Sequence, residues 1–209
     1  MFSNISFSLQ KGDKVAVLSQ DHLAITSFFQ ILMELEQADG GEFKWGTTIS
    51  RSYLPNDNLS YFHEDLNLID WLRQYSKDKD ETYVRGFLGK MLFSGEETLK
   101  KSNVLSGGEK VRCMISRMML TNANCLVMDE PTNHLDLESI TAFNNGLKDW
   151  KHVALFATHD HAFAETVANR IIELTPYGII DKQMTYDEYL SSPVVKEQRE
   201  LLYGKLTTA

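Results

Sequence analysis

The sequence predicts an α/β fold, a parallel sheet core with antiparallel strands and a helical lobe. Strand-like and helix-like segments alternate at both ends of the chain, which is typical of a parallel sheet covered by helices. Between them, residues 65–120 show helical patterns only. No linker separates these parts, so we expect one domain over residues 1–209, with a core lobe at about 1–60 and 121–190, a helical lobe at about 61–120 and a C-terminal helical tail at about 191–209.

The first sixty residues predict several strands around one helix. FSNISFSL, at residues 2–9, alternates apolar and polar side chains, which predicts a half-buried antiparallel strand. Residues 23–35 carry apolar side chains at helical spacing and no proline, so we expect a helix there. Short apolar segments predict further strands at residues 14–18, 42–45 and 49–54.

The rest of the chain predicts the helical lobe and the second half of the sheet. Residues 65–120 contain three stretches with helical spacing of apolar residues. Two short apolar runs, at residues 124–129 and 153–157, predict buried strands. A helix is expected after Leu137, and a closing hairpin is expected from residues 171–174 and 178–181.

The composition predicts a cytoplasmic protein with reduced cysteines. Lysine and arginine number 21 and aspartate and glutamate 29, and the net charge of −8 disfavours a broad electrostatic grip on nucleic acid or anionic lipid. Cys113 and Cys125 lie in apolar contexts, so we expect buried thiols and no disulfide. No apolar run approaches the roughly 18 residues of a membrane helix. The N-terminus turns polar too early for a signal peptide.

The motif LSGGEK, at residues 105–110, directly precedes a long amphipathic helical pattern. Ser106, Gly107 and Gly108 leave backbone N–H groups free to face an anion, and the helix dipole adds to the attraction. The same residues also suit a simple N-cap, since serine caps helices and glycine permits tight turns. Taken alone, the motif leaves both interpretations open.

The segment CLVMDEPTNHLD, at residues 125–136, is an apolar strand that ends in two adjacent acids. In an α/β protein this places both carboxylates at the C-terminal edge of the sheet, where ligands bind. Asp129 is a candidate to hold Mg²⁺ through water, because Mg²⁺ keeps much of its hydration shell. Glu130 is a candidate to orient and deprotonate the water that attacks a γ-phosphate. The adjacent acids together with PTNHLD disfavour the alternative, a proline turn with solvated acids.

The third motif is THD, at residues 158–160, which follows the strand-like run VALFA. A histidine at the C-terminal end of a strand can donate a hydrogen bond to a phosphate oxygen. A single histidine in such a place is more often an ordinary loop residue. His159 lies about thirty residues after the acid pair, one strand along, and this spacing favours the functional interpretation.

In this order and at these gaps, LSGGEK, LVMDEPTNHLD and ATHD resemble the signature, Walker B, D-loop and H-loop motifs of ATP-binding cassettes, which have a P-loop NTPase-like fold. The full form EPTNHLD resembles the ABC-F branch, whose members carry two cassettes in one chain and no membrane domain. MLFSGEETLKKSNVLSGGEKVR, ITAFNNGLKDW and TYDEYL look like the C-terminal cassette of a YbiT-type ABC-F protein. The resemblance covers about residues 2–190.

The resemblance implies two nucleotide sites between a head-to-tail pair of cassettes, each binding ATP with Mg²⁺. Asp129, Glu130 and His159 would serve ATP bound on this chain. The signature residues would face ATP bound on the partner, and these are Ser106, Gly107, Gly108 and Glu109. Asp136 would lie at the dimer seam. Asn56 stands where the Q-loop glutamine is expected, and its side chain is one methylene shorter.

The phosphate-binding loop expected after the strand VAVL departs from the form GxxxxGK[ST]. Ser19 and Ala24 replace its glycines and Ile25 replaces its lysine, whereas Thr26 remains as a potential Mg²⁺ ligand. A charge-assisted hydrogen bond contributes about 1.5–3 kcal/mol. At about 1.4 kcal/mol per tenfold, we expect at least a tenfold to hundredfold weaker binding of ATP. The candidate loop residues are Ser19, Gln20, Asp21, His22, Leu23, Ala24, Ile25, Thr26 and Ser27.

These features lead to one principal function and two alternatives. The principal one is an ABC-F-type ATPase cassette that works with a second cassette, either in the same longer chain or as a homodimer. Its expected role is ribosome-associated translation regulation, in which any contact with the ribosome would be made by segments absent here. The first alternative is a non-catalytic scaffold or regulatory binding module, in which Ile25 marks lost turnover. The second is the motor of a membrane transporter, which the NHLD motif and the compact helical lobe disfavour.

Overall fold

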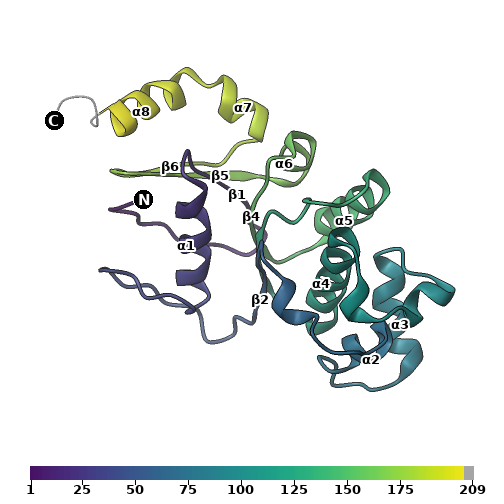
Figure 1. The fold of residues 1–209 in the computed structure, drawn as a ribbon. Helices are drawn as coiled ribbons and strands as arrows, with labels where there is room; N and C mark the ends of the chain where they lie inside the picture. The colour runs from purple at the N-terminus through teal and green to yellow at the C-terminus, as the bar shows by residue number, and fades with distance from the viewer. Residues whose placement is uncertain (205–209) are drawn as a thin grey trace.

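A six-stranded sheet forms the centre of the molecule, with α1 on one side and α4 and α5 on the other (Figure 1). The computed structural model describes residues 1–204. The strand order is β2-β3-β4-β1-β5-β6, and neighbouring strands are parallel except for the β5–β6 pair. The strands are β1 (Lys14–Leu18), β2 (Arg51–Leu54), β3 (Cys125–Asp129), β4 (Val153–Ala157), β5 (Arg170–Thr175) and β6 (Gly178–Lys182).

The helices of the described chain fall into groups. Helices α2, α3 and α4 belong to the helical lobe, and α7 and α8 form a C-terminal pair (Figure 1). Most begin at a side chain that accepts a hydrogen bond from the first turn, which is the usual way of satisfying free N–H groups there. They are α1 (His22–Leu32), α2 (Leu68–Arg73), α3 (Glu81–Lys90), α4 (Gly107–Thr121), α5 (Leu137–Asp149), α6 (His161–Val167), α7 (Tyr186–Ser191) and α8 (Pro193–Tyr203), with short 3₁₀ helices at Leu59–Tyr61, Gly95–Leu99 and Ser102–Val104.

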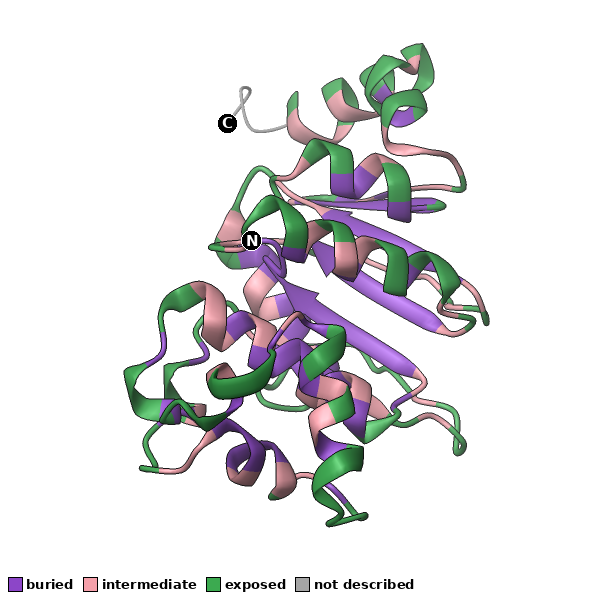
Figure 2. Cartoon of the chain, turned by 90° about the vertical axis from the view of Figure 1, so that its right-hand side faces the viewer, coloured by how far each residue is buried: buried purple, intermediate pink, exposed green. Residues whose placement is uncertain are grey.

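The central strands are buried on both faces, as Figure 2 shows. Along β1, Val15 and Val17 pack into the apolar cluster that includes α1, whereas Ala16 belongs to the cluster on the opposite face. Successive side chains of a strand point to opposite faces, so a strand covered on both sides has an unbroken apolar sequence. This packing fixes the carboxyl ends of β1, β3 and β4 at one edge of the sheet.

The helical lobe has an aromatic core. The Trp71 ring stacks on Phe62 with centroids 4.7 Å apart, and its indole N–H donates to the carbonyl of Tyr61. The Arg117 guanidinium lies 4.7 Å from the ring centroid of Tyr61 and 4.5 Å from that of Tyr75. These contacts pack α4 against the segments that precede it, because a cation between two aromatic faces is attracted to both rings.

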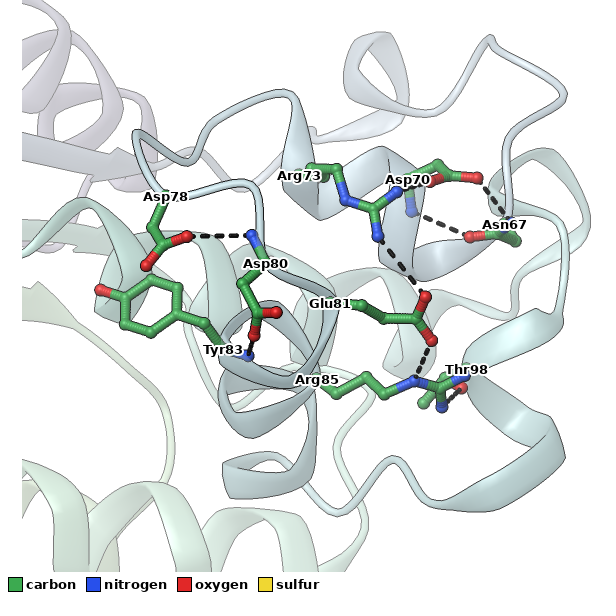
Figure 3. Close-up of polar contacts among 9 residues, drawn as sticks. All are labelled: Asn67, Asp70, Arg73, Asp78, Asp80, Glu81, Tyr83, Arg85 and Thr98. Carbon is green, nitrogen blue, oxygen red and sulfur yellow. Dashed lines mark hydrogen bonds and ion pairs between the residues drawn. The ribbon is translucent and has the colours of Figure 1, made fainter.

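A chain of polar contacts joins α2, α3 and the 3₁₀ helix Gly95–Leu99 (Figure 3). Arg73 on α2 pairs with Asp70 and with Glu81 at the start of α3. Arg85, one turn further along α3, donates to Glu81 at 2.8 Å and to the buried Thr98 hydroxyl at 2.7 Å. Exposed ion pairs contribute little individually, so their role is to fix how these short helices are placed together.

The structure confirms the α/β class, the parallel centre of the sheet and the closing hairpin. The strands predicted at residues 14–18, 124–129 and 153–157 are β1, β3 and β4. The helix predicted at residues 23–35 is the shorter α1, and the strand predicted at residues 49–54 begins only at Arg51. Within the predicted C-terminal tail the structure has α8, and residues 205–209 of that tail lie outside the described residues.

Two predicted strands, at residues 2–9 and 42–45, are absent, and both segments are irregular. The alternating burial predicted for the first is present, because Phe7 and Leu9 are half-buried against the α1 side of the core. Neither segment belongs to a ladder of backbone hydrogen bonds with a neighbouring strand. Alternation of side chains reports that one face is packed, whereas a strand also requires a hydrogen-bonded partner.

Both cysteines are buried and free, as predicted. Burial raises the pKa of the Cys125 thiol to about 12 and that of Cys113 higher still. Both thiols therefore stay protonated at neutral pH and act as small apolar side chains. In residues 1–204, no helix combines the length and hydropathy that crossing a bilayer requires.

Candidate functional site

The candidate site lies where β1, β4 and β3, neighbours in the sheet, reach their carboxyl ends. Ligands of open parallel sheets bind at this edge, because the loops that follow the strands converge there. The loop after β1 leads into α1, the acid pair ends β3, and His159 follows β4.

Thr26 and Asp129 are in direct contact. The Thr26 hydroxyl donates to Asp129 Oδ2 at 2.8 Å. Asp129 is 1% exposed, and its other oxygen, Oδ1, is buried without a hydrogen-bond partner among the described residues. Burial raises the pKa of this carboxyl, and the bond from Thr26 opposes the rise. A hydroxyl beside a carboxylate with an unused buried oxygen suits Mg²⁺ and its water shell.

Glu130 is held next to His159. Its backbone N–H donates to the carbonyl of Ala157 at 3.0 Å, which supports a φ of +53°, a left-handed conformation uncommon outside glycine. Glu130 Oε2 accepts from the backbone N–H of His159 at 3.2 Å, and Oε1 lies 3.4 Å from His159 Nε2. Burial raises the pKa of Glu130, and His159 opposes that rise. A buried carboxylate of raised pKa is suited to accept a proton from water.

The loop that leads into α1 is closed by its own side chains. Asp21 is the N-cap of α1, and its carboxylate accepts from the Leu23 N–H at 3.1 Å. The Ser19 hydroxyl accepts from the Asp21 N–H, also at 3.1 Å. His22, the first residue of α1, lies 3.5 Å from the side-chain amide of Asn56. Two backbone donors that a phosphate could use are therefore bound to side chains.

Ile25 points into the core. It is 6% exposed and belongs to the apolar cluster that includes Phe28 and Phe29 of the same helix. Ala24 is also buried, whereas Leu23 is 67% exposed. The position predicted for a phosphate-binding lysine thus carries a side chain that packs beneath the loop. Among the remaining loop residues, Gln20 is exposed and Ser27 is half-buried.

Ser106 and Glu109 cap α4 reciprocally. The Ser106 hydroxyl accepts from the Glu109 N–H at 3.3 Å, and Glu109 accepts from the Ser106 N–H at 2.8 Å. Lys100 Nζ donates to Glu109 at 2.7 Å. Partial burial raises the pKa of Glu109, but the bonds from Lys100 and Ser106 outweigh it and hold the pKa at about 2. The structure shows the N-cap that the sequence suggested, formed as a capping box.

A cavity of about 430 Å³ joins the acid pair to the start of α4. Its lining includes Asn56, Gly107, Lys110, Asp129 and Glu130. Gly107, a predicted signature residue, therefore lies along the same cavity as the two acids of its own chain.

Asp136 and Tyr203 have structural roles and are not among the residues that line this cavity. The predicted seam residue Asp136 caps α5 by accepting from the Ser139 N–H at 2.7 Å. The Tyr203 hydroxyl of α8 donates to Glu173 and to the carbonyl of Leu174, and it interacts with the backbone of Gln20 in the loop after β1. No motif in the sequence marks this approach of the C-terminal helix to the loop.

Gly108 is required by the close approach of the loop that follows β3. A Cβ atom built at Gly108 would overlap the carbonyl oxygen of His134, whose own φ is +64°. Gly108→Ala is therefore expected to lower the free energy of unfolding by about 1–3 kcal/mol, the usual cost of overpacking, in a chemical denaturation experiment. Gly89→Ala is the matched control, because a Cβ there meets nothing within 4 Å. Equal effects of the two substitutions would contradict this packing argument.

A parallel sheet with a threonine–aspartate pair, a buried glutamate and a histidine at its carboxyl edge, beside a lobe whose helix begins with Ser-Gly-Gly, defines a nucleotide-binding domain of the ATP-binding cassette type. A family model described as ABC transporter matches residues 2–133. The chain belongs to this family, as one of its ATP-binding cassettes.

Known relatives place the chain near ABC-F proteins. It is 57% identical over 207 residues to the "Uncharacterized ABC transporter ATP-binding protein YkpA" of Bacillus subtilis, which covers 98% of this chain and 38% of that protein. It is 37% identical over 193 residues to the "Probable ATP-binding protein YbiT" of Escherichia coli O157:H7, covering 92% and 36%. The "Energy-dependent translational throttle protein EttA" of Escherichia coli K12 is 26% identical over 198 residues, covering 90% and 35%.

The chain spans less than two fifths of the length of these three relatives. Among solved structures, "RNase-L Inhibitor" superimposes with a TM-score of 0.67 at 20% identity, covering 92% of this chain and 44% of that one. This likeness confirms the fold.

Proposed function

We propose that the chain is an ABC-F-type cassette that binds and hydrolyses ATP together with a second cassette, and that its own phosphate-binding loop is weakened. One observation carries the proposal. The Thr26–Asp129 contact and the Glu130–His159 contact are both formed at the same edge of the sheet. They supply a metal-binding pair and a base beside each other, which is what hydrolysis of a phosphoanhydride requires.

Each side chain has a distinct part in this proposal. Thr26 and Asp129 would hold Mg²⁺, which neutralises phosphate charge when bound. Glu130 takes the proton of the attacking water, and its burial favours that role because a raised pKa strengthens the base. His159, whose side chain is 84% exposed, is free to donate a hydrogen bond to a phosphate oxygen.

Ile25 and Asp21 account for the weakened loop. Ile25 supplies no cation for the β- and γ-phosphates and is packed into the core. The Asp21 carboxylate already occupies an N–H group at the start of α1, where a phosphate would otherwise bind, and it adds a repelling negative charge. Binding of Mg·ATP then depends on Thr26, on Asp129 and on the remaining backbone donors.

The partner in this proposal is a second cassette arranged head to tail. Ser106, Gly107, Gly108 and Glu109 would face ATP held by the partner, with Asp136 at the seam. The second cassette belongs either to a longer chain or to a second copy, since the relatives are more than twice as long as this chain. The ABC-F motif EPTNHLD and the similarity to a translational throttle protein support a cytoplasmic, ribosome-associated role in regulating translation.

Binding of a fluorescent ATP analogue with Mg²⁺ tests the proposal. Ile25→Lys is expected to bind the analogue about tenfold to hundredfold more tightly than the wild type. The long lysine side chain can extend out of the apolar cluster so that its amine reaches the phosphates, which restores about 1.5–3 kcal/mol of charge-assisted hydrogen bonding. Ile25→Met is the matched control, because it keeps the buried volume without adding charge. Thermal unfolding of each variant separates binding effects from loss of the fold.

Two other results would overturn parts of this proposal. Tight binding by the wild type would show that the loop is competent without a lysine, so that Glu130 and His159 belong to a fully working site. Absence of binding by every variant up to millimolar nucleotide would favour the non-catalytic scaffold, an alternative that the buried Ile25 also suits.

A further inference from the structure

Three side chains from distant parts of the sequence converge beside the acid pair. His22 begins α1, Glu130 follows β3 and His159 follows β4. One ligand atom from each, a ring nitrogen or a carboxylate oxygen, lies within 4.8 Å of the other two. We refer to these three residues as the histidine–glutamate cluster.

The spacing within the cluster is close to that of a metal centre. Two ligand atoms bound tetrahedrally to one ion at about 2.0–2.1 Å lie about 3.3 Å apart. His159 Nε2 and Glu130 Oε1 are already 3.4 Å apart. The His22 ring lies with its centroid 6.0 Å from that of His159 and with an interplanar angle of 32°. All ligand atoms of the cluster lie within 4.8 Å of one another, so His22 has to shift by up to about 1.5 Å to complete three-point coordination.

The cluster combines one fixed ligand with two adjustable ones. The Glu130 side chain is 3% exposed, and its Oε2 is held by the His159 backbone N–H. The His159 side chain is 84% exposed and His22 is half-buried, so both rings can rotate toward the carboxylate without disturbing the core. A buried, anchored carboxylate beside two imidazoles that reach solvent is well placed to bind a cation between them.

The ligand chemistry selects the kind of ion. Two imidazole nitrogens and one carboxylate oxygen, with positions open to water, suit Zn²⁺ and its neighbours Co²⁺ and Ni²⁺. Mg²⁺ prefers oxygen ligands, and the Thr26–Asp129 pair offers them without using any atom of the cluster. The apolar Ile25 at the nearby loop position brings no cationic side chain that would compete with the ion.

We propose that His22, Glu130 and His159 form a binding site for a borderline divalent transition-metal ion, with Zn²⁺ as its representative. A bound ion would engage the Glu130 carboxylate that otherwise accepts a proton from water. Occupancy of the cluster would then exclude hydrolysis on this chain, and this consequence rests on the proposed function.

The binding test uses the nucleotide-free chain. Titration with Co²⁺ is expected to give the visible absorption of a low-coordinate site at one ion per chain, and Zn²⁺ is expected to displace it. His22→Asn is expected to weaken Co²⁺ and Zn²⁺ binding by at least about tenfold to hundredfold, the effect seen even for outer partners of metal ligands. His63→Asn is the matched control, because His63 is exposed and lies outside the cluster.

Defined results would overturn the site. Equal Zn²⁺ affinity of the wild type and His22→Asn would show that the cluster does not bind the ion. Loss of the ion in His161→Asn would place it instead at His161 and Asp187, an exposed pair 2.7 Å apart. In the hydrolysis assay, saturating Zn²⁺ is expected to inhibit the wild type, and undiminished hydrolysis with the ion bound would refute the regulatory consequence. A chain that binds Zn²⁺ but hydrolyses no ATP, either alone or with a second cassette, would overturn the proposed function and leave the metal site standing.

Discussion

Glu130→Gln is expected to lower the rate of ATP hydrolysis by about 10²–10⁴-fold, the usual contribution of a positioned general base. The glutamine keeps the shape of the side chain and can still accept from the His159 N–H, but it cannot take a proton from water. Single-turnover hydrolysis at saturating ATP measures the chemical step directly. Nucleotide binding is expected to persist, because Thr26 and Asp129 are unchanged.

Two further measurements make this prediction specific. Because burial raises the pKa of Glu130, wild-type hydrolysis is expected to fall as the pH drops through that raised pKa, above the ordinary carboxyl value of about 4.3. The same raised pKa means that the charged carboxylate costs folding free energy at neutral pH, so Glu130→Gln is expected to keep or raise the melting temperature. Glu138→Gln, on the exposed face of α5, is the control and is expected to change neither property.

An unchanged hydrolysis rate in Glu130→Gln would remove this residue from the chemistry. Asp129 would then be the other candidate to accept the proton of water at this edge of the sheet, because its buried Oδ1 has no hydrogen-bond partner among the described residues.

The parts of the fold that the sequence could predict are those that depend on local patterns and burial. Short apolar runs such as CLVMD and VALFA are typical of strands buried on both faces, and both form such strands. The acids after the first run then had to lie at the carboxyl edge of the sheet. Residues 2–9 illustrate the limit, because their alternation is satisfied by packing on the core and no partner strand is present in the described chain.

The parts of the site that escaped sequence analysis depend on contacts between distant segments. The resemblance implies that the loop containing His22, the acid pair and His159 serve one nucleotide. The close approach of His22 to Glu130 and His159 themselves depends on β1, β4 and β3 being neighbours, which no motif contains. The burial of Ile25 depends on which face of α1 packs against the sheet, and a motif alignment does not contain that information. The capping roles of Ser106 and Asp136 are easier to predict from sequence, since each residue directly precedes a helical pattern.

The second large effect is expected at Glu173, a buried acid on β5. Its carboxylate accepts from the Tyr189 hydroxyl at 2.6 Å, from Arg199 Nε at 2.7 Å and from the Tyr203 hydroxyl at 3.0 Å. Through these three bonds the sheet holds α7 and α8. The Glu173 side chain is 4% exposed, so its removal leaves a partly buried guanidinium and a buried hydroxyl without partners.

Glu173→Ala is expected to lower the free energy of unfolding by about 3–5 kcal/mol, the cost of removing one partner of a buried ion pair. Denaturant unfolding followed by tryptophan fluorescence measures it. Glu173→Gln is expected to cost less, because its amide oxygen can still accept from Tyr189, while Tyr203 keeps the carbonyl of Leu174 as an acceptor. Glu197→Ala, at an exposed position of α8, is the matched control and is expected to stay within about 0.5 kcal/mol of the wild type.

The same substitution tests whether the C-terminal helix supports the loop after β1. Tyr203 contacts both Glu173 and the backbone of Gln20, so releasing α8 frees one side of the nucleotide-binding loop. Weaker ATP binding in Glu173→Gln, whose fold is largely kept, would show that support. If stability falls in Glu173→Ala while Glu173→Gln binds ATP as the wild type does, α8 stabilises the sheet alone, and the loop is positioned by the Asp21 cap and the packing of Ile25.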